Sequence, residues 1–200
     1  MEWQATPTFW LSGTGFVNRL EDAVGNVTIG FGPGTFNPGG FIPAGGVLRQ
    51  RQNIDLIVAP GFETKAEWEV LSGLSVRAAY LFTNPTIERA SEPLLRGKLL
   101  AQTPQHVFTG GVEWKPAAKW FVGAELRYNS DQFEDDQNSR VLASFATVDA
   151  SVRYDFTAHV SAALRVENLF DTEIETGKSA DGLTSIGAPR QVSLQLRWQL

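Results

Sequence analysis

Three consecutive acids, Glu134, Asp135 and Asp136, are the residues whose type and spacing come nearest to metal chemistry in this chain. Carboxylate oxygens suit Ca²⁺, so the triplet could bind that ion. Its spacing matches no known calcium loop, however, and the residues around it are polar. We therefore interpret residues 130–142 as an ordinary acidic surface loop and predict no metal site.

Histidine and cysteine restrict the chemistry further, because the chain has only two His and no Cys. Thiolate chemistry, disulfides and the familiar zinc spacings are thereby excluded. We expect His106 and His159 to lie near opposite rims of a sheet, too far apart to share a metal. No nucleophile elbow or catalytic triad is present either. The sequence therefore predicts a protein that is not an enzyme and has no catalytic residue and no cofactor.

The segment from Gly25 to Gly46 is rich in glycine and contains Phe31, Phe36 and Phe41. A phosphate-binding loop would need a helix after it, and no helical pattern follows. We interpret this segment as a long exposed loop, with the three phenylalanines as candidate ligand contacts. The simpler alternative is that these rings pack on one another.

The elements that must position these residues are strands, because apolar and polar residues alternate with a period of two along most of the chain. The apolar positions carry no charge, whereas the positions between them hold Glu, Lys, Arg and Asp, so each strand has a dry and a wet face. The predicted strands cover about residues 5–18, 58–70, 75–82, 108–114, 120–128, 146–154, 160–167 and 191–200.

Charged residues on the wet face could line a solute path or hold a plug through ion pairs. The alternative is a solvated wall with cross-strand pairs that each contribute about 0.2 to 1 kcal/mol. The residues in question are Glu63, Lys65, Glu67, Glu69, Arg77, Glu113, Glu125, Arg127, Asp149, Arg153, Arg165, Glu167 and Arg197.

The connections between the predicted strands alternate in length. Tight turns are expected at residues 71–74, 115–119 and 155–159, and long links at 20–48, 90–104, 130–142 and 172–188. All six Trp fall beside the short turns or the chain end, as in the aromatic girdle of a membrane protein. The pattern predicts an antiparallel transmembrane β-barrel segment of about eight strands, with short periplasmic turns and long extracellular loops.

Charge and hydropathy agree with this interpretation. The net charge of -5 argues against a nucleic-acid partner. No run of 18 apolar residues could form a transmembrane helix, so contact with a membrane requires a barrel. The first thirteen residues lack the apolar core of a secretory signal peptide.

Two motifs near the end of the sequence carry a family resemblance. Residues Val166 to Asp171 (VENLFD) followed by Gly187 to Arg190 (GAPR) and a final alternating strand resemble the C-terminal end of TonB-dependent outer-membrane receptors. Residues Phe16 to Val24, Pro60 to Glu63 and Pro104 to His106 are similar to further strand elements of that family. The resemblance covers nearly all of residues 1–200.

The resemblance implies a fold and a function. A TonB-dependent receptor has a barrel of about 22 strands around a plug. Residues 1–200 are then expected to be the C-terminal part of such a barrel in the Gram-negative outer membrane, without the plug, the energy-coupling segment or the signal sequence. The implied partners are outer-membrane lipid, the plug and remaining barrel, and TonB through the missing N-terminal part. The implied solute is a scarce nutrient such as an iron-siderophore, a cobalamin or a carbohydrate.

Two other interpretations remain open at this point. The first is an autonomous eight-stranded outer-membrane barrel with a structural or adhesive role, because eight strands can enclose an interior filled by side chains. The second is a soluble β-sandwich that acts as a binding module, because sandwich strands also alternate.

Overall fold

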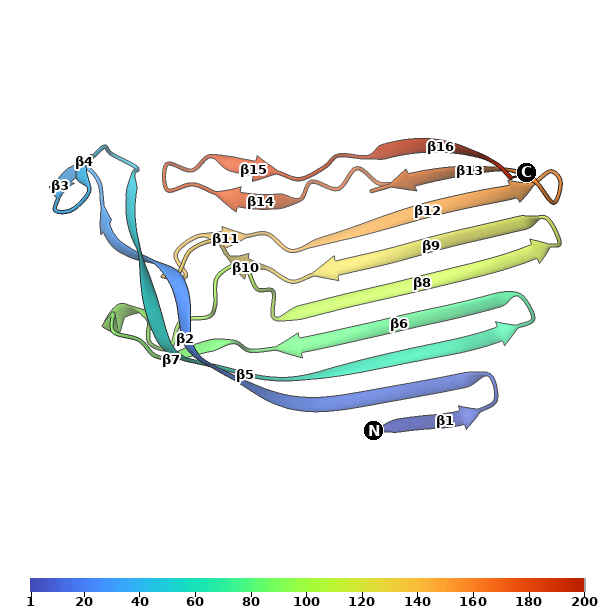
Figure 1. The fold of residues 1–200 in the computed structure, drawn as a ribbon, viewed down its shortest axis with the longest axis horizontal. Helices are drawn as coiled ribbons and strands as arrows, with labels where there is room; N and C mark the ends of the chain where they lie inside the picture. Colours follow the sequence, from blue (N-terminus) through green and yellow to red (C-terminus); the bar gives the residue numbers. More distant parts are fainter. Residues whose placement is uncertain (200) are drawn as a thin grey trace.

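The computed structural model describes residues 1–199 and consists mainly of one large antiparallel sheet (Figure 1). No described helix is long and apolar enough to cross a membrane. The sheet runs in the order β1 (Glu2–Thr6), β2 (Phe9–Phe31), β5 (Val47–Leu71), β6 (Leu74–Thr83), β8 (His106–Ala117), β9 (Trp120–Asn129), β12 (Phe145–Asp155), β13 (Val160–Glu167) and β16 (Gln191–Trp198), with β7 (Thr86–Arg89) paired to β5.

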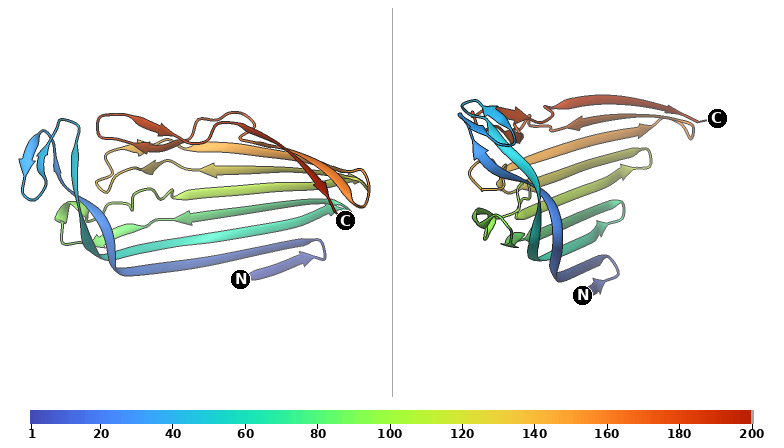
Figure 2. Two further views of the ribbon diagram at one scale, coloured as in Figure 1. Left: turned by 45° about the horizontal axis from the view of Figure 1, so that its top comes forward. Right: turned by 60° about the vertical axis from the view of Figure 1, so that its left-hand side comes forward.

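The sheet is open, with β1 and β16 at its two edges (Figures 1 and 2). The described strands therefore do not close into an eight-stranded barrel, contrary to the first alternative. Residues 1–199 also provide no second sheet packed on the apolar face, contrary to the sandwich alternative. The predicted final strand ends at Trp198 in the structure, and Leu200 lies outside the described residues.

The apolar face of the sheet is exposed. On β16, Leu194 is 70% exposed and Leu196 is 76% exposed. An apolar surface this large and continuous is typical of a membrane or protein interface and not of a free surface in water. The predicted dry face is therefore the exposed apolar face of the described sheet.

The predicted tight turns are confirmed at the rim where β5 meets β6, β8 meets β9 and β12 meets β13. Gly73 has a φ of 82° in the first of these turns, a conformation that favours glycine. Eight residue steps separate His106 from Trp114 on β8, which is about 26 Å along the strand. A tilted strand of that length is close to the height of the apolar band of outer-membrane barrels.

Aromatic side chains mark both boundaries of this band. Near the short turns, Trp120 lies 4.7 Å from Tyr154, measured between ring centroids. At the other boundary, Phe82 lies 5.1 Å from His106 and 5.7 Å from Phe62. The position of the Trp residues along the sequence gives no sign of this second group, because it contains no Trp.

One tryptophan of the predicted girdle is on the wrong face. Trp10 pairs with Glu67 across β2 and β5, so its side chain shares the charged face. Its neighbour Phe9 pairs with Trp68 and shares the apolar face instead. The prediction for Trp10 considered only its level along the strand, whereas its face depends on the register with β5.

The predicted long link at residues 20–48 is wrong in most of its length. β2 continues to Phe31 and β5 begins at Val47, so the two strands extend together as one ribbon beyond the other strands (Figure 1). A short hairpin, β3 (Gly34–Phe36) with β4 (Gly40–Ile42), joins them. The ribbon is stabilised by a buried apolar cluster formed by Val27, Ile54, Ile57, Ile87, Ala90 and Leu95.

The other three long links are confirmed, and each carries short structure of its own. The first follows β7 and contains the helix η1 (Pro93–Leu95). The second contains β10 (Gln132–Phe133) paired with β11 (Val141–Leu142), and the third contains β14 (Glu175–Lys178) paired with β15 (Thr184–Ile186).

Candidate functional site: the charged wall and the loops above it

The wet face of the sheet is a charged wall in which residues from neighbouring strands form ion pairs. Arg77 on β6 donates from Nη1 to Glu113 Oε1 at 2.5 Å and from Nη2 to Glu125 on β9. Gly111 lies opposite Arg77 on the intervening strand, and a Cβ there would be only 2.8 Å from Arg77 Nε. The glycine therefore leaves room for the arginine to reach across β8.

A second group of ion pairs lies at the other side of the wall. Arg165 on β13 is 3.6 Å from Asp149 on β12 and 3.0 Å from Glu167. Asp149 is the most buried of these side chains, whereas the others and those around Arg77 are about half exposed, so most of the pairs contribute little to stability by themselves.

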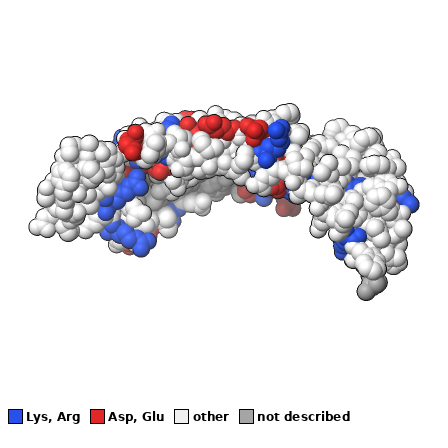
Figure 3. Space-filling view, turned by 90° about the horizontal axis from the view of Figure 1, so that it is seen from above, with Lys and Arg blue, Asp and Glu red and all other residues white. Residues whose placement is uncertain are grey.

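Acidic residues outnumber basic ones in the middle of the wall. We call this region the acidic belt; it comprises Glu67, Glu69, Glu113, Glu125, Asp149 and Glu167, with Arg77 and Arg165 among them. Figure 3 shows a band of acidic side chains along one margin of the molecule, with Lys and Arg side chains beside it. The belt therefore has the charge to bind a surface that carries Lys or Arg.

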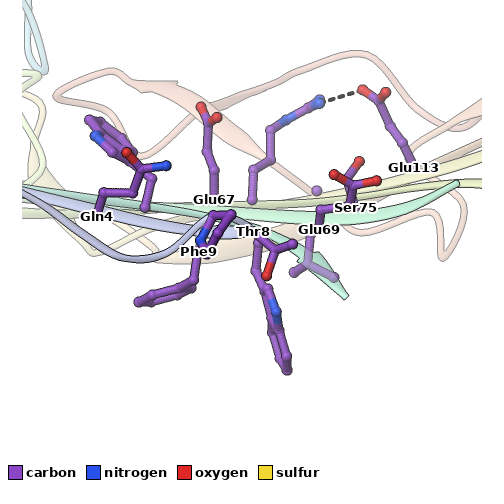
Figure 4. Close-up of a pocket in the computed structure, with 13 residues that line it drawn as sticks. Gln4, Thr8, Phe9, Glu67, Glu69, Ser75 and Glu113 are labelled. Carbon is purple, nitrogen blue, oxygen red and sulfur yellow. Dashed lines mark hydrogen bonds and ion pairs between the residues drawn. The ribbon is translucent and has the colours of Figure 1, made fainter. Parts of the chain in front are cut away.

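Shallow hollows lie along this wall. One, with a volume of about 350 Å³, is lined by Trp10, Glu67, Arg77 and Glu113, among others. Figure 4 shows Glu67 and Glu113 on one side of the sheet and Phe9 on the other. A larger hollow of about 490 Å³ follows β8, β9, β12 and β13. These hollows thus present polar groups along much of the wall.

The Asn-Leu-Phe-Asp motif ends β13 by a specific backbone turn. Asn168 has a φ of 51° and is 5% exposed. Its side-chain amide donates to Thr172 O at 2.8 Å, and its Oδ1 accepts from Thr172 N at 2.9 Å. Asp171 Oδ1 then accepts from the backbone N of Arg190 at 2.8 Å, which ties this turn to the start of the last strand. The two sequence motifs are therefore joined in space.

The acidic triplet organises the loop in which it lies. Asp135 is 2% exposed, and its Oδ1 accepts from Ser139 N at 2.9 Å and from Arg140 N at 2.8 Å. Its Oδ2 accepts from Ser139 Oγ at 2.8 Å. Burial alone would raise the pKa of Asp135, but these hydrogen bonds and the nearby Arg140 charge outweigh burial and lower it. The carboxylate is thus used within the loop itself.

The same loop is attached to the ribbon formed by β2 and β5. Asp136 accepts from Thr28 N and from Thr28 Oγ, both at 2.7 Å, across a separation of 108 residues. Asn138 Oδ1 accepts from Leu99 N at 2.7 Å. The described residues contain no group of three or more His, Cys, Asp or Glu arranged to hold a metal.

The loop also contacts the β14–β15 hairpin. Arg140 Nε donates to Lys178 O at 3.0 Å, and Lys178 Nζ donates to Val141 O at 3.1 Å. Glu175 Oε2 accepts from Ala143 N at 2.8 Å, which lowers the pKa of Glu175. The loop at residues 130–142 therefore connects three segments that are distant in sequence.

The three candidate phenylalanines lie on the ribbon and its hairpin and not in an irregular loop. Phe36 packs against the backbone at Gly30 and Gly34. Phe31 is 48% exposed on β2, and Phe41 is 69% exposed on β4. Phe31 and Phe41 are therefore accessible, whereas Phe36 has a packing role.

The two histidines lie at opposite rims, as the sequence predicted. His106 begins β8, at the boundary of the apolar band away from the short turns. Tyr80 Oη lies 2.7 Å from His106 Nδ1 within the aromatic group at that boundary. His159 lies in the short turn between β12 and β13.

Comparison with known proteins agrees with this architecture. The family model for the TonB dependent receptor-like β-barrel matches residues 1–169. The ferrichrome outer membrane transporter/phage receptor of Escherichia coli K12 is 30% identical over 125 residues, which are 58% of this chain and 16% of that protein. The ferrioxamine B receptor of Salmonella typhimurium LT2 is 24% identical over 155 residues, which are 74% of this chain and 22% of that protein.

A solved structure has the same fold. The siderophore receptor PiuA from Acinetobacter baumannii superposes with a TM-score of 0.73 at 16% identity, covering 98% of this chain and 27% of that one. This chain thus spans about a sixth to a quarter of the length of these proteins. The relatives are named as receptors and transporters and not as enzymes. The chain belongs to the TonB-dependent receptor-like β-barrel family, whose members lie in the outer membrane of Gram-negative bacteria.

Proposed function

We propose that residues 1–200 form the C-terminal part of the barrel of a receptor that imports a ferric siderophore across the outer membrane. The observation that carries this proposal is the 30% identity to the ferrichrome transporter, on a sheet with an exposed apolar face and a charged wall. The similarity to the ferrioxamine B receptor supports the same solute class. The protein is a transporter component and not an enzyme.

The open edges of the sheet support a larger barrel. β1 and β16 each have one edge free of a neighbouring strand in residues 1–199. Such edges pair readily with further strands, and closure of a barrel satisfies their backbone N–H and C=O groups. We expect the remaining strands of the receptor to pair there and outer-membrane lipid to cover the apolar face.

The charged wall is then the inner surface of the barrel and the docking surface for the plug. The acidic belt provides carboxylates at the level where a plug would lie, and charge-assisted hydrogen bonds to Arg or Lys would hold it. TonB would supply energy through the N-terminal part of the receptor. In this arrangement, Phe31 and Phe41 on the extracellular ribbon contact the incoming solute.

Iron uptake tests the proposal. Cells that lack the gene for this receptor are expected to lose uptake of one radiolabelled ferric siderophore, and a plasmid copy is expected to restore it. Deletion of tonB should abolish the same uptake. Uptake of all ferric hydroxamates and ferric catecholates that is equal with and without the receptor would refute a role in siderophore import.

A further inference from the structure

We infer that the extracellular loops of this receptor select a ferric siderophore that carries a positively charged amine, and that Glu134 and Asp181 are the residues that select it. The inference rests on the proposed import function and adds the charge of the solute to it. The site is a hollow of about 610 Å³, which we call the loop hollow, between the ribbon, the loop at residues 130–142 and the β14–β15 hairpin.

The segments around the loop hollow are distant in sequence and meet closely in space. The ribbon and the β14–β15 hairpin lie side by side at the end of the sheet away from the short turns (Figures 1 and 2). They meet just before β5, where a Cβ at Gly45 would be only 3.0 Å from Asp181 Cβ. Gly45 has a φ of 77°, a conformation that favours glycine. This close approach positions Asp181 against the ribbon at the edge of the hollow.

The loop hollow opens on the side of the ribbon that continues the charged wall. Val47 and Arg49 line it, and both occupy odd positions on β5, as do Glu63 and Glu67 on the inner wall. Phe31 is the cross-strand partner of Val47 and is 48% exposed. A solute that enters the barrel through its mouth would therefore pass this hollow, with an exposed aromatic ring beside it.

Two carboxylates line the loop hollow without a cationic partner among the described residues. Glu134 Oε2 accepts from the neutral side-chain amide of Gln102 at 3.0 Å. Asp181 accepts from Ser179 Oγ, and this hydrogen bond lowers the pKa of Asp181, so the group stays ionised at neutral pH. A carboxylate has several acceptor positions, so both groups can still accept from a charged donor.

Two of the three cations that line the hollow are already paired. Arg140 Nη1 lies 3.9 Å from Asp135 Oδ2, and Arg140 Nε donates to Lys178 O at 3.0 Å. Lys178 Nζ lies 3.4 Å from Glu175 Oε2. Carboxylates outside the lining therefore balance most of the positive charge of Arg140 and Lys178.

Arg49 is the third cation of the lining, and it is exposed. Its cross-strand partner Thr28 donates two hydrogen bonds to Asp136, so a third carboxylate lies on this part of the ribbon. One arginine thus stands against three carboxylates that form no ion pair of their own within residues 1–199. The charge that remains in and beside the loop hollow is negative, which favours a cationic group on the solute and repels an anionic one.

Ferric complexes that differ only in one terminal charge test this inference. The receptor that contains these strands is placed in nanodiscs of zwitterionic phosphatidylcholine, and binding is measured by equilibrium dialysis with radioactive iron. The probes are the ferric complexes of a linear trihydroxamate with a terminal primary amine, of its neutral N-acetyl derivative and of its anionic N-succinyl derivative. We expect the amine form to bind on the order of tenfold more tightly than the N-acetyl form. The N-succinyl form should bind least, and the differences should shrink as salt is raised.

Matched variants localise the preference. The double variant Glu134→Gln and Asp181→Asn should bring the affinities of the amine and N-acetyl forms within about twofold of each other, by weakening the amine form alone. Arg49→Gln should widen the difference, because it removes the opposing cation. Glu173→Gln is the control, because Glu173 is an exposed acid before the β14–β15 hairpin that does not line the hollow, and it should keep the wild-type ratio. Unchanged heat-modifiable migration of each variant will show that the barrel is folded.

Several results would overturn the inference. These are failure of the amine form to bind, equal binding of the amine and N-acetyl forms, tighter binding of the N-succinyl form, or an unchanged ratio in the double variant. TonB-dependent uptake of another ferric siderophore would still leave the proposed import in place. Conversely, a preference for the amine form in nanodiscs without TonB-dependent uptake of any ferric siderophore would refute import and leave the charge preference of the loop hollow standing.

Discussion

Replacement of Asp135 by Asn tests whether the loop at residues 130–142 is held by its own carboxylate. Asp135 is 2% exposed and accepts three hydrogen bonds, from Ser139 N, Ser139 Oγ and Arg140 N, at 2.8 to 2.9 Å. Arg140 Nη1 lies 3.9 Å from its Oδ2. Asparagine keeps one acceptor oxygen, loses the charge and places an NH₂ group toward Arg140.

The expected loss follows from these contacts. A hydrogen bond to a charged group contributes about 1.5 to 3 kcal/mol, against about 0.5 to 1.5 kcal/mol for a neutral one. A loss of about 1 kcal/mol in each of three bonds lowers the local free energy of unfolding by about 2 to 4 kcal/mol. Amide exchange in the loop should therefore accelerate by about 30-fold to 1,000-fold.

Hydrogen exchange read by mass spectrometry on the receptor in nanodiscs measures this change. Faster exchange should appear at residues 130–142, while β9 and β12 keep wild-type rates. Asp131→Asn is the control, because it is the same substitution at an exposed position of the same loop. Unchanged loop exchange in Asp135→Asn, or an equal effect of Asp131→Asn, would refute the reasoning.

The pH dependence gives a second check. The hydrogen bonds from Ser139 and Arg140 lower the pKa of Asp135 in the folded loop below its ordinary value, so the stabilisation is complete above that ordinary value and is lost as the pH falls through the folded pKa. Protease sensitivity of the wild-type loop should therefore approach that of Asp135→Asn only in strong acid. Convergence of the two proteins already at pH 6 would contradict the assignment.

Three further predictions follow from the fold and the loops. Leu194→Arg on the lipid face should lower the free energy of unfolding in vesicles by about 2 to 4 kcal/mol. Its control, Gln195→Arg on the inner wall, should lower it by less than about 1 kcal/mol. Equal losses in the two variants would contradict the assignment of faces. Asn168→Ala should lower the free energy of unfolding by about 2 kcal/mol, because alanine is strained at a positive φ and two hydrogen bonds are lost. Asn168→Gly should avoid the cost of the positive φ and lose only the hydrogen bonds, and the heat-modifiable folded fraction of each variant measures the difference. Thr28→Val and Asp136→Asn should be non-additive by about 1 to 2 kcal/mol in a double-mutant cycle read by hydrogen exchange, and additivity would show that this contact does not hold the loop.

The alternation of apolar and polar residues determined the strands of the sheet wherever its two faces meet different solvents. Along β6, β8, β9, β12, β13 and β16, one face meets lipid and the other meets water, so alternate residues differ in polarity and the strands can be read directly from the sequence. The tight turns followed from the breaks in that alternation. The terminal motifs located the end of β13, and Asn168 shows the physical reason, a left-handed turn closed by its own side chain.

The tertiary structure decided the features that depend on contacts between distant residues. The ribbon formed by β2 and β5 lies beyond the apolar band, where neither face meets lipid, so its alternation is lost although its backbone pairing continues to Phe31. The inward position of Trp10 depends on the register with Glu67, which no local pattern specifies. The contact of Asp136 with Thr28 joins residues 108 positions apart. Sequence alone determined the strands of the main sheet, because the contrast between lipid and water makes alternate residues differ in polarity. Only the folded chain determined how the acidic loop and the ribbon meet, because hydrogen bonds between distant segments leave no periodic signal.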